Sequence, residues 1–292
     1  MTKVVLRWVM PILALFVLGP SASRLVGLLR ASDGSQDVTL LVNTTPALGV
    51  LVAFAIVALA LVGALPAARF LGARVGLTVA GLTLGWAAWY TAPIGLLARS
   101  HSGSGLLITL LGEGVLMLGL GLVILLGVIH VGESNEGDPL CAPVREQLHK
   151  SLKTGPGLGA MAGALVASMV IAWFVATEPT RGQALFAGFL GGIGAGSVGV
   201  WCGSFLGKDV PPLAALMGVL LACVAAPALG LLMPGGEALR DAVVSDTLPG
   251  PVRLQPFDVL VGMTLGAPIG LGWVGSMLDT SEHASGRRPA RA

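Results

Sequence analysis

A single glutamate interrupts one of the longest apolar stretches of this sequence. Glu113 lies within residues 106–130, LLITLLGEGVLMLGLGLVILLGVIH, between Gly112 and Gly114. An ionisable side chain at such a position is costly to bury in a membrane and marks a functional site by default. The glycines beside it leave room for a water molecule, an ion or another helix. We expect Glu113 either to carry a proton or an ion, or to hydrogen-bond this segment to a neighbouring helix.

Two prolines also lie within apolar stretches. Pro227 is in residues 212–234, and Pro268 is in residues 256–278. Proline lacks an N–H donor and clashes with the preceding turn, so we expect a kink or a break at each position. Carbonyl groups freed at such a break can bind a cation or a substrate, although membrane helices also tolerate proline for structural reasons alone. Thr264 belongs to the same candidate site.

Asp258 follows Pro256 at the start of the last apolar stretch. An acidic side chain in the first turn of a helix complements the helix dipole. We therefore expect Asp258 to cap this helix, and a cation-binding site is the alternative interpretation.

Motifs that would indicate an enzyme or a cofactor are missing from the sequence. It has no P-loop, no serine nucleophile elbow, no His-Glu-x-x-His and no Cys-x-x-Cys-His. Acidic, histidine and cysteine residues do gather between His130 and His149, but their spacing matches no tetrahedral metal site. We therefore expect no cofactor and no metal, and a membrane-embedded enzyme is the least favoured class.

The elements that would carry these residues are long apolar runs. Of the 292 residues, 54% are hydrophobic and only 11% are charged, whereas a soluble domain usually carries about 25% charged residues. A helical run near twenty residues crosses about 30 Å of hydrocarbon. The sequence therefore predicts an all-α polytopic integral membrane protein with eight transmembrane helices. The eight runs are residues 3–19, 47–65, 75–93, 106–130, 156–176, 183–206, 212–234 and 256–278.

The first run has a second interpretation. Lys3 and Arg7 form a basic start, residues 8–19 are apolar, and small residues follow at 21–23. This pattern is also the outline of a signal peptide. We expect a retained first helix, whereas cleavage of residues 1–23 would leave seven spans.

Glycines recur at helical spacing in the C-terminal half. Steps of three or four residues place them along one face of a helix, and such faces let helix backbones approach closely in a membrane. We therefore predict a tight bundle formed by the last four helices. The glycines expected to pack helices are Gly188, Gly192, Gly196, Gly199, Gly203, Gly207, Gly262, Gly266 and Gly270.

We expect residues 1–280 to form a single transmembrane domain. An amphipathic cytoplasmic linker at 139–154 separates two halves, 1–154 and 155–280. Residues 281–292 are polar and basic, and they are expected to form a disordered cytoplasmic tail.

The distribution of basic residues predicts the orientation. Eleven of the 17 Lys and Arg residues fall on the N-terminal side of the eight-helix arrangement. Cytoplasmic loops carry the excess of these residues. Both termini are therefore expected in the cytoplasm, in a bacterial inner membrane.

These features favour a transporter-like protein that moves a small solute or ion, coupled to protons through Glu113. The alternative is a non-catalytic subunit of a larger membrane complex, whose small-residue faces contact partner helices. The lipid bilayer is the expected partner in both cases, together with a second copy or another membrane protein. A net charge of +2 gives no argument for nucleic acid.

Overall fold

The computed structural model describes most of the chain. The described residues are 2–100, 104–133, 140, 142–207, 209–232, 241–245 and 247–284. Throughout these residues the regular structure is helical, with no strand. The predicted class of an α-helical membrane protein is confirmed, because seven helices are long and apolar enough to cross a membrane. They are Lys3–Val26, Pro46–Leu71, Ser104–Gly132, Gly155–Val175, Arg181–Leu206, Pro212–Leu231 and Pro256–Met277.

Two of these seven helices are composite. The first consists of α1 (Thr2–Leu13), a π-helical turn η1 (Ala14–Leu18) and α2 (Gly19–Val26). The last consists of α13 (Pro256–Val261), the π-helical turn η3 (Gly262–Gly266) and α14 (Ala267–Ala284). The other five are α3 (Pro46–Leu71), α6 (Ser104–Gly132), α8 (Gly155–Val175), α9 (Arg181–Leu206) and α10 (Pro212–Leu231).

The remaining predicted run, residues 75–93, forms the shorter helix α4 (Ala73–Trp89). Its 17 residues rise about 25 Å at 1.5 Å per residue, less than the about 30 Å of a typical hydrocarbon core. Gly72 alone separates α4 from α3, and its φ of 101° lies in the left-handed region that favours glycine. The chain therefore turns back within a single residue.

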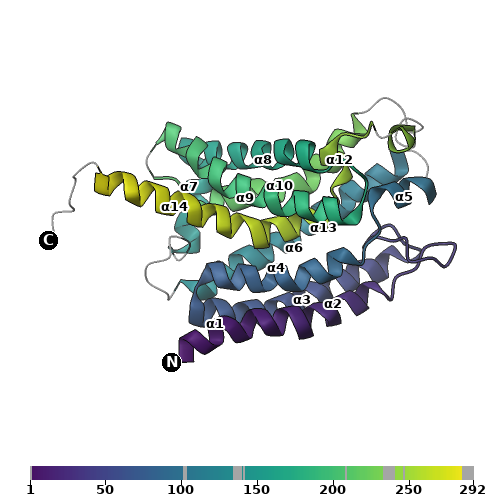
Figure 1. Ribbon diagram of the computed structural model, residues 1–292, viewed down its shortest axis with the longest axis horizontal. Coiled ribbons are helices and arrows are strands. Elements are labelled where there is room, and N and C mark those ends of the chain that lie inside the picture. Colours follow the sequence, from purple (N-terminus) through teal and green to yellow (C-terminus); the bar gives the residue numbers. More distant parts are fainter. Residues whose placement is uncertain are drawn as a thin grey trace.

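The helices pack as an elongated bundle, with α8, α9 and α10 on one side and α1, α2 and α3 on the other (Figure 1). Between them lie α4, α6 and the composite helix α13–η3–α14. The start of α1 and the end of α14 lie at one end of the bundle. We call the opposite end, which carries residues 27–45 and α5 (Ile94–Ser100), the distal end.

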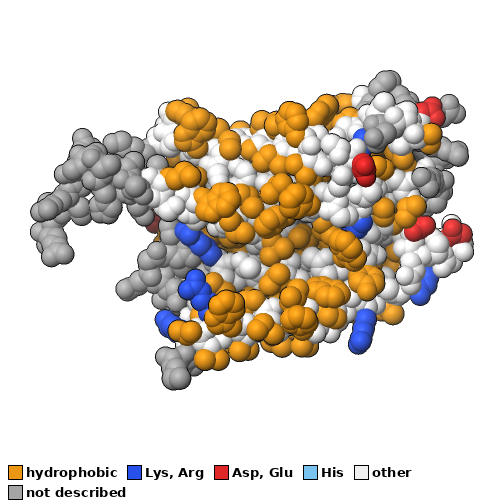
Figure 2. Space-filling view, viewed as in Figure 1, with side chains coloured by type: hydrophobic (Ala, Val, Ile, Leu, Met, Phe, Trp, Pro, Cys, Tyr) orange, Lys and Arg blue, Asp and Glu red, His pale blue; other side chains and the backbone are white. Residues whose placement is uncertain are grey.

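The visible face has the polarity of a membrane protein. Hydrophobic side chains cover its middle, and charged side chains gather toward the two ends (Figure 2). Large apolar residues such as Phe174 and Trp8 are more than two thirds exposed, at 75% and 71%. In a bilayer these side chains contact lipid, so their exposure costs nothing there.

The prolines distort the helices less than the sequence predicts. Helix α10 continues through Pro227 without a break. The π-helical turn η3 ends two residues before Pro268, and η1 ends at the same distance before Pro20. A π-helical turn inserts one extra residue into the helix. The carbonyl group that would otherwise clash with the proline ring is thereby moved out of register with it. The turn therefore accommodates the proline without ending the helix.

The glycine series of α9 contacts two different neighbours. A methyl group built at Gly192 would lie 2.1 Å from the carbonyl oxygen of Gly262, and one at Gly262 would lie 2.1 Å from that of Gly188. Nearer the other end of α9, a methyl group at Gly203 would lie 2.7 Å from the carbonyl oxygen of Pro156, at the start of α8. The backbones therefore touch where these glycines lie.

The same close approach occurs at the other glycines predicted to pack helices. Built methyl groups would lie between 2.1 and 2.8 Å from heavy atoms of a neighbouring helix at Gly196, Gly199, Gly207, Gly266 and Gly270, and 2.5 Å from Asp258 at Gly188.

Besides α5, the described residues include the short helices α7 (Val144–Lys153) and α12 (Gly250–Arg253). Helix α7 falls within the predicted linker. Its Gln147 is buried, whereas Leu152 is 49% exposed. The Lys150 Nζ lies 2.6 Å from Asp209 Oδ2, and this hydrogen bond raises the pKa of Lys150 above its usual range. Helix α12 (Gly250–Arg253) lies at the distal end. The predicted tail at 281–292 lies mostly outside the described residues.

Candidate functional site

Glu113 is fully buried in α6, nine residues from its start. This places it about 14 Å along the helix from the distal end. Its Oε2 accepts a 2.5 Å hydrogen bond from the Thr39 hydroxyl and a 3.0 Å hydrogen bond from the Leu41 backbone N–H. Its Oε1 has no hydrogen-bond partner among the described residues. Half of the carboxyl group is therefore held in place, and the other half is free to accept.

The segment that binds Glu113 is a compact turn. The Val42 N–H donates to the Thr39 hydroxyl oxygen at 3.1 Å, and the Thr39 N–H donates to the Val42 carbonyl at 3.1 Å. The Asn43 amide donates to the Leu40 carbonyl at 2.8 Å. Thr39 thus connects the turn to the carboxyl group, because its hydroxyl donates to Glu113 while accepting from Val42.

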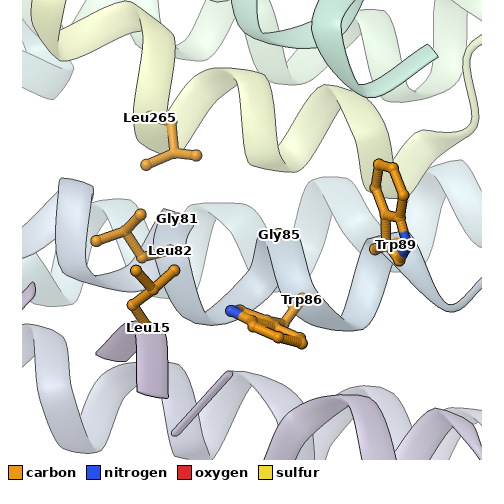
Figure 3. A pocket seen from close by; sticks show the side chains of 7 residues that line it. All are labelled: Leu15, Gly81, Leu82, Gly85, Trp86, Trp89 and Leu265. Atoms are coloured by element: carbon orange, nitrogen blue, oxygen red, sulfur yellow. The ribbon is translucent and has the colours of Figure 1, made fainter. Parts of the chain in front are cut away.

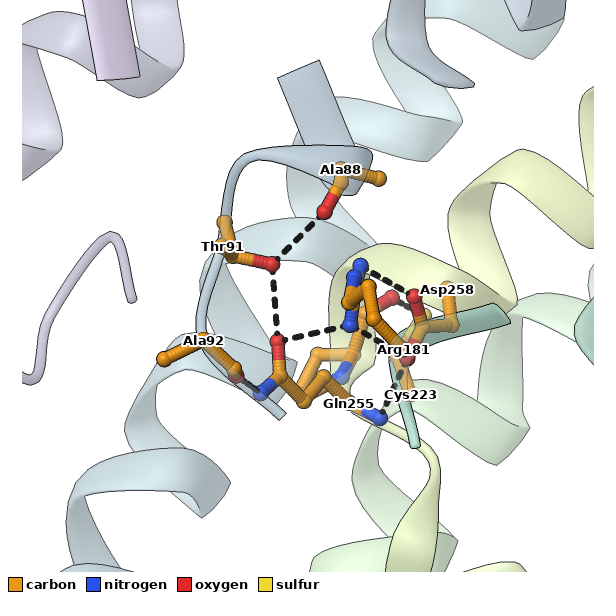
Figure 4. Close-up of polar contacts among 8 residues, drawn as sticks. Ala88, Thr91, Ala92, Arg181, Cys223, Gln255 and Asp258 are labelled. Carbon is orange, nitrogen blue, oxygen red and sulfur yellow. Dashed lines mark hydrogen bonds and ion pairs between the residues drawn. The ribbon is translucent and has the colours of Figure 1, made fainter. Parts of the chain in front are cut away.

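A second buried polar cluster joins three helices at the distal end (Figure 4). Arg181 begins α9 and Asp258 lies in the first turn of α13. Their side chains form an ion pair, with Arg181 Nη1 donating to Asp258 Oδ2 at 3.0 Å and Nη2 beside Oδ1. The Asp258 side chain is 0% exposed and that of Arg181 is 10% exposed. The pair is therefore removed from water.

Gln255 extends this cluster to a third element. Its side-chain oxygen accepts from Arg181 Nη1 at 3.2 Å and from the Thr91 hydroxyl at 3.0 Å. Its side-chain nitrogen donates to the Ala92 carbonyl, in the turn after α4. Its backbone N–H donates to Asp258 Oδ2 at 3.0 Å, which completes a capping box at the start of α13. Asp258 therefore caps its helix and binds Arg181 as well.

The two clusters are neighbours across α10. The Cys223 thiol donates to the Pro256 carbonyl at 3.4 Å. On the opposite side, a methyl group built at Gly114 would lie 2.2 Å from the Cys223 carbonyl oxygen. The two clusters therefore approach α10 at the same residue, Cys223.

Thr264 is buried in η3, six residues after Asp258 in the same composite helix. Its hydroxyl donates to the Leu260 and Val261 carbonyls of its own helix, at 2.9 and 3.1 Å. The Thr264 hydroxyl group is therefore hydrogen-bonded within its own helix. Pro227 lies buried inside α10, and Pro268 lies in the first turn of α14.

Sequence reasoning missed several members of the site. Arg181 counts in the sequence only as a basic residue ahead of an apolar run, although its position before residues 183–206 was a signal that it starts a helix. Thr39 carries no local signal, because Glu113 lies 74 residues away in the sequence. Gln255 could have been found as the residue before Pro256 that caps α13, but its contact with Arg181, also 74 residues away, has no local signal.

Residues that the structure describes line one cavity along α4 and another at the distal end. One, of about 330 Å³, is an apolar groove along α4 (Figure 3). The other, of about 460 Å³, lies at the distal end beside the Thr39–Val42 turn. The groove is lined by Leu15, Gly81, Leu82, Gly85, Trp86, Trp89 and Leu265. The distal cavity is lined by Leu41, Val42, Asn43, Pro46, Gly105, Leu106, Thr109 and Gly112.

Metal ligation finds no support in the part of the chain that the structure describes, where no three His, Cys, Asp or Glu side chains gather to hold an ion. Part of the acidic region between His130 and His149, including Cys141, lies outside the described residues.

The geometry defines a class: an α-helical integral membrane protein with two adjacent buried polar clusters near one end of its bundle. Compared with known proteins, the chain matches no protein-family model, no curated protein and no solved structure.

Proposed function

We propose that the protein moves a small solute or ion across the membrane and that Glu113 is the group that takes up and releases the coupled proton. The observation that carries this proposal is the fully buried carboxyl group whose Oε1 has no partner among the described residues. A purely structural glutamate gains most when both oxygens are bonded, because an unsatisfied buried oxygen costs about 1–3 kcal/mol. A proton carrier needs one oxygen free.

The Arg181–Asp258 pair supports the same proposal. An intramembrane carboxyl group that alternates between charged and neutral forms needs nearby charges that stabilise one form over the other. Arg181 and Asp258 carry opposite charges, and Cys223 contacts Gly114, which is next to Glu113, and Pro256, which is two residues before Asp258.

The test is proton flux into proteoliposomes that contain a pH-sensitive dye. Glu113→Gln is expected to lower the flux about a hundredfold, as loss of a positioned proton-transfer group does. Glu146→Gln is the matched control, since the side chain of Glu146 is 56% exposed in α7. It is expected to leave the flux unchanged. Equal flux from Glu113→Gln and the unmodified protein would exclude the proposal.

A non-catalytic subunit of a membrane complex is the second candidate. The groove along α4 favours this candidate, because its lining of glycine, leucine and tryptophan residues is apolar. In that case a helix of a second copy or of another protein would occupy the groove, and Glu113 would only hold the distal turn. Glu113→Gln would then lower stability without changing any flux.

We also propose that α4 completes an eighth crossing. It begins where α3 ends and returns along α3 to the distal end, where α6 starts (Figure 1). The packing of α8, α9, α10 and α14 would then form the predicted tight bundle of the last four helices. The excess of Lys and Arg residues on the N-terminal side favours cytoplasmic termini and a bacterial inner membrane.

A further inference from the structure

The distal cavity ends against the residues that hold Glu113. The side chain of Leu41 lines the cavity, while the backbone N–H of the same residue donates to Glu113 Oε2. Gly112, which also lines the cavity, directly precedes Glu113 in α6. Leu41 and Gly112 therefore form a wall shared by the cavity and the carboxyl group.

This wall is thin and closed by a side chain. Leu41 Cδ1 lies 3.8 Å from the position of a methyl group built at Gly112, which is ordinary van der Waals contact. Because Gly112 has no side chain, the side chain of Leu41 is what fills the space between Gly112 and the turn. Leu41 is half-buried and belongs to a turn outside the helices, so its side chain can move without disturbing helix packing.

The cavity has the size and the groups to hold water. Its volume of about 460 Å³ far exceeds the about 30 Å³ that one water molecule occupies in the liquid. Asn43 and Thr109 place polar atoms on its wall. Each is already bonded, Thr109 to the Gly105 carbonyl and Asn43 to the Thr45 N–H, yet both oxygens keep a lone pair for water.

We propose that this cavity is the aqueous route by which protons reach Glu113 from the distal side, and that the Leu41 side chain closes it. The inference rests on the proposed role of Glu113, but access to a carboxyl group is measurable without any transport. Water carries the proton as far as Leu41. Displacement of Leu41 then exposes the carboxyl group, since the backbone of the same residue already contacts it.

The test is chemical labelling of Glu113 in proteoliposomes oriented through a C-terminal tag. A quaternary-ammonium carbodiimide, which does not cross the bilayer, is added with glycinamide to one side at a time. The carboxyl group adds across a C=N bond, and glycinamide then displaces the urea to leave an amide. Mass spectrometry of the peptide that contains Glu113 gives the labelling rate, and Glu113→Gln identifies the labelled position.

Reagent on the distal side is expected to label Glu113, and Leu41→Ala is expected to raise that rate about tenfold, which corresponds to a barrier lowered by about 1.4 kcal/mol. Thr109→Trp, which fills the cavity instead of opening it, is expected to lower the rate below that of the unmodified protein. Val115→Ala is the control, because Val115 is 58% exposed on another part of α6, and it should leave the rate unchanged.

Equal labelling from both sides, or rates insensitive to both Leu41→Ala and Thr109→Trp, would overturn the access route. These outcomes are separable from failure of the proposed function. A protein whose labelling follows the expected pattern but whose proton flux is unaffected by Glu113→Gln has the route and lacks the transport role. A protein with Glu113-dependent flux but no distal labelling has the transport role and uses a different route.

Discussion

Asp258→Ala is expected to lower the stability of the folded protein by about 3–5 kcal/mol, because removing one partner of a buried ion pair leaves the other charge uncompensated. The Arg181 side chain would remain 10% exposed with no carboxylate beside it. The substitution also removes the acceptor for the Gln255 N–H at the start of α13, and loss of a helix cap costs about 1 kcal/mol more. Thermal unfolding in detergent, followed by tryptophan fluorescence, measures the change.

Two controls separate the buried charge from other effects. Asp209→Ala removes a side chain that is 78% exposed and paired with Lys150, and exposed pairs contribute at most about 1 kcal/mol. The double variant Arg181→Met with Asp258→Leu removes both charges, and it is expected to recover much of the loss from Asp258→Ala. A double variant less stable than Asp258→Ala would show that the charge of Arg181 is already compensated elsewhere.

Gly192→Leu is expected to prevent the composite helix α13–η3–α14 from packing on α9. Even the first carbon of a side chain would lie 2.1 Å from the Gly262 carbonyl oxygen, and backbone cannot move aside as a flexible side chain can. Overpacking costs about 1–3 kcal/mol in well-packed cores, and a clash with backbone lies at or above the upper end. The measurement is the fraction of folded protein during titration with a denaturing detergent.

Gly119→Leu provides the comparison for this substitution. Gly119 also lies within a membrane-spanning helix, but open space surrounds it. We expect leucine to be tolerated at position 119, because its transfer into the hydrocarbon core of a membrane is favourable. If Gly119→Leu and Gly192→Leu were equally destabilising, the cause would be the loss of glycine itself. The close contact between α9 and η3 would then not explain the effect of Gly192→Leu.

The helices were predictable because their signals are local. A run of apolar residues identifies a membrane span without reference to any other part of the chain, and glycines at steps of four residues identify a face that permits close approach. Asp258 was likewise predictable as a cap, since the preceding Pro256 indicates the helix start.

The site was only partly predictable, because its geometry depends on contacts between distant residues. Glu113 is conspicuous in its apolar run, but nothing near Thr39 indicates that a turn would fold around a carboxyl group 74 residues away. Pro268 indicates a disturbed helix, and yet the choice between a break and a π-helical turn depends on packing. Methyl groups built at Gly262 and Gly266 would collide with backbone atoms of α9. This close packing holds η3 against α9, and the helix continues through η3 into α14.

Gly72 has a consequence for how the protein is made. Helix α4 has 17 residues, at the lower limit for a membrane span, while α3 is the most hydrophobic of the seven spans among the described residues. A linker of one residue holds the end of α3 beside the start of α4. If α4 makes the eighth crossing proposed above, we expect α3 and α4 to enter the bilayer together as one hairpin during synthesis.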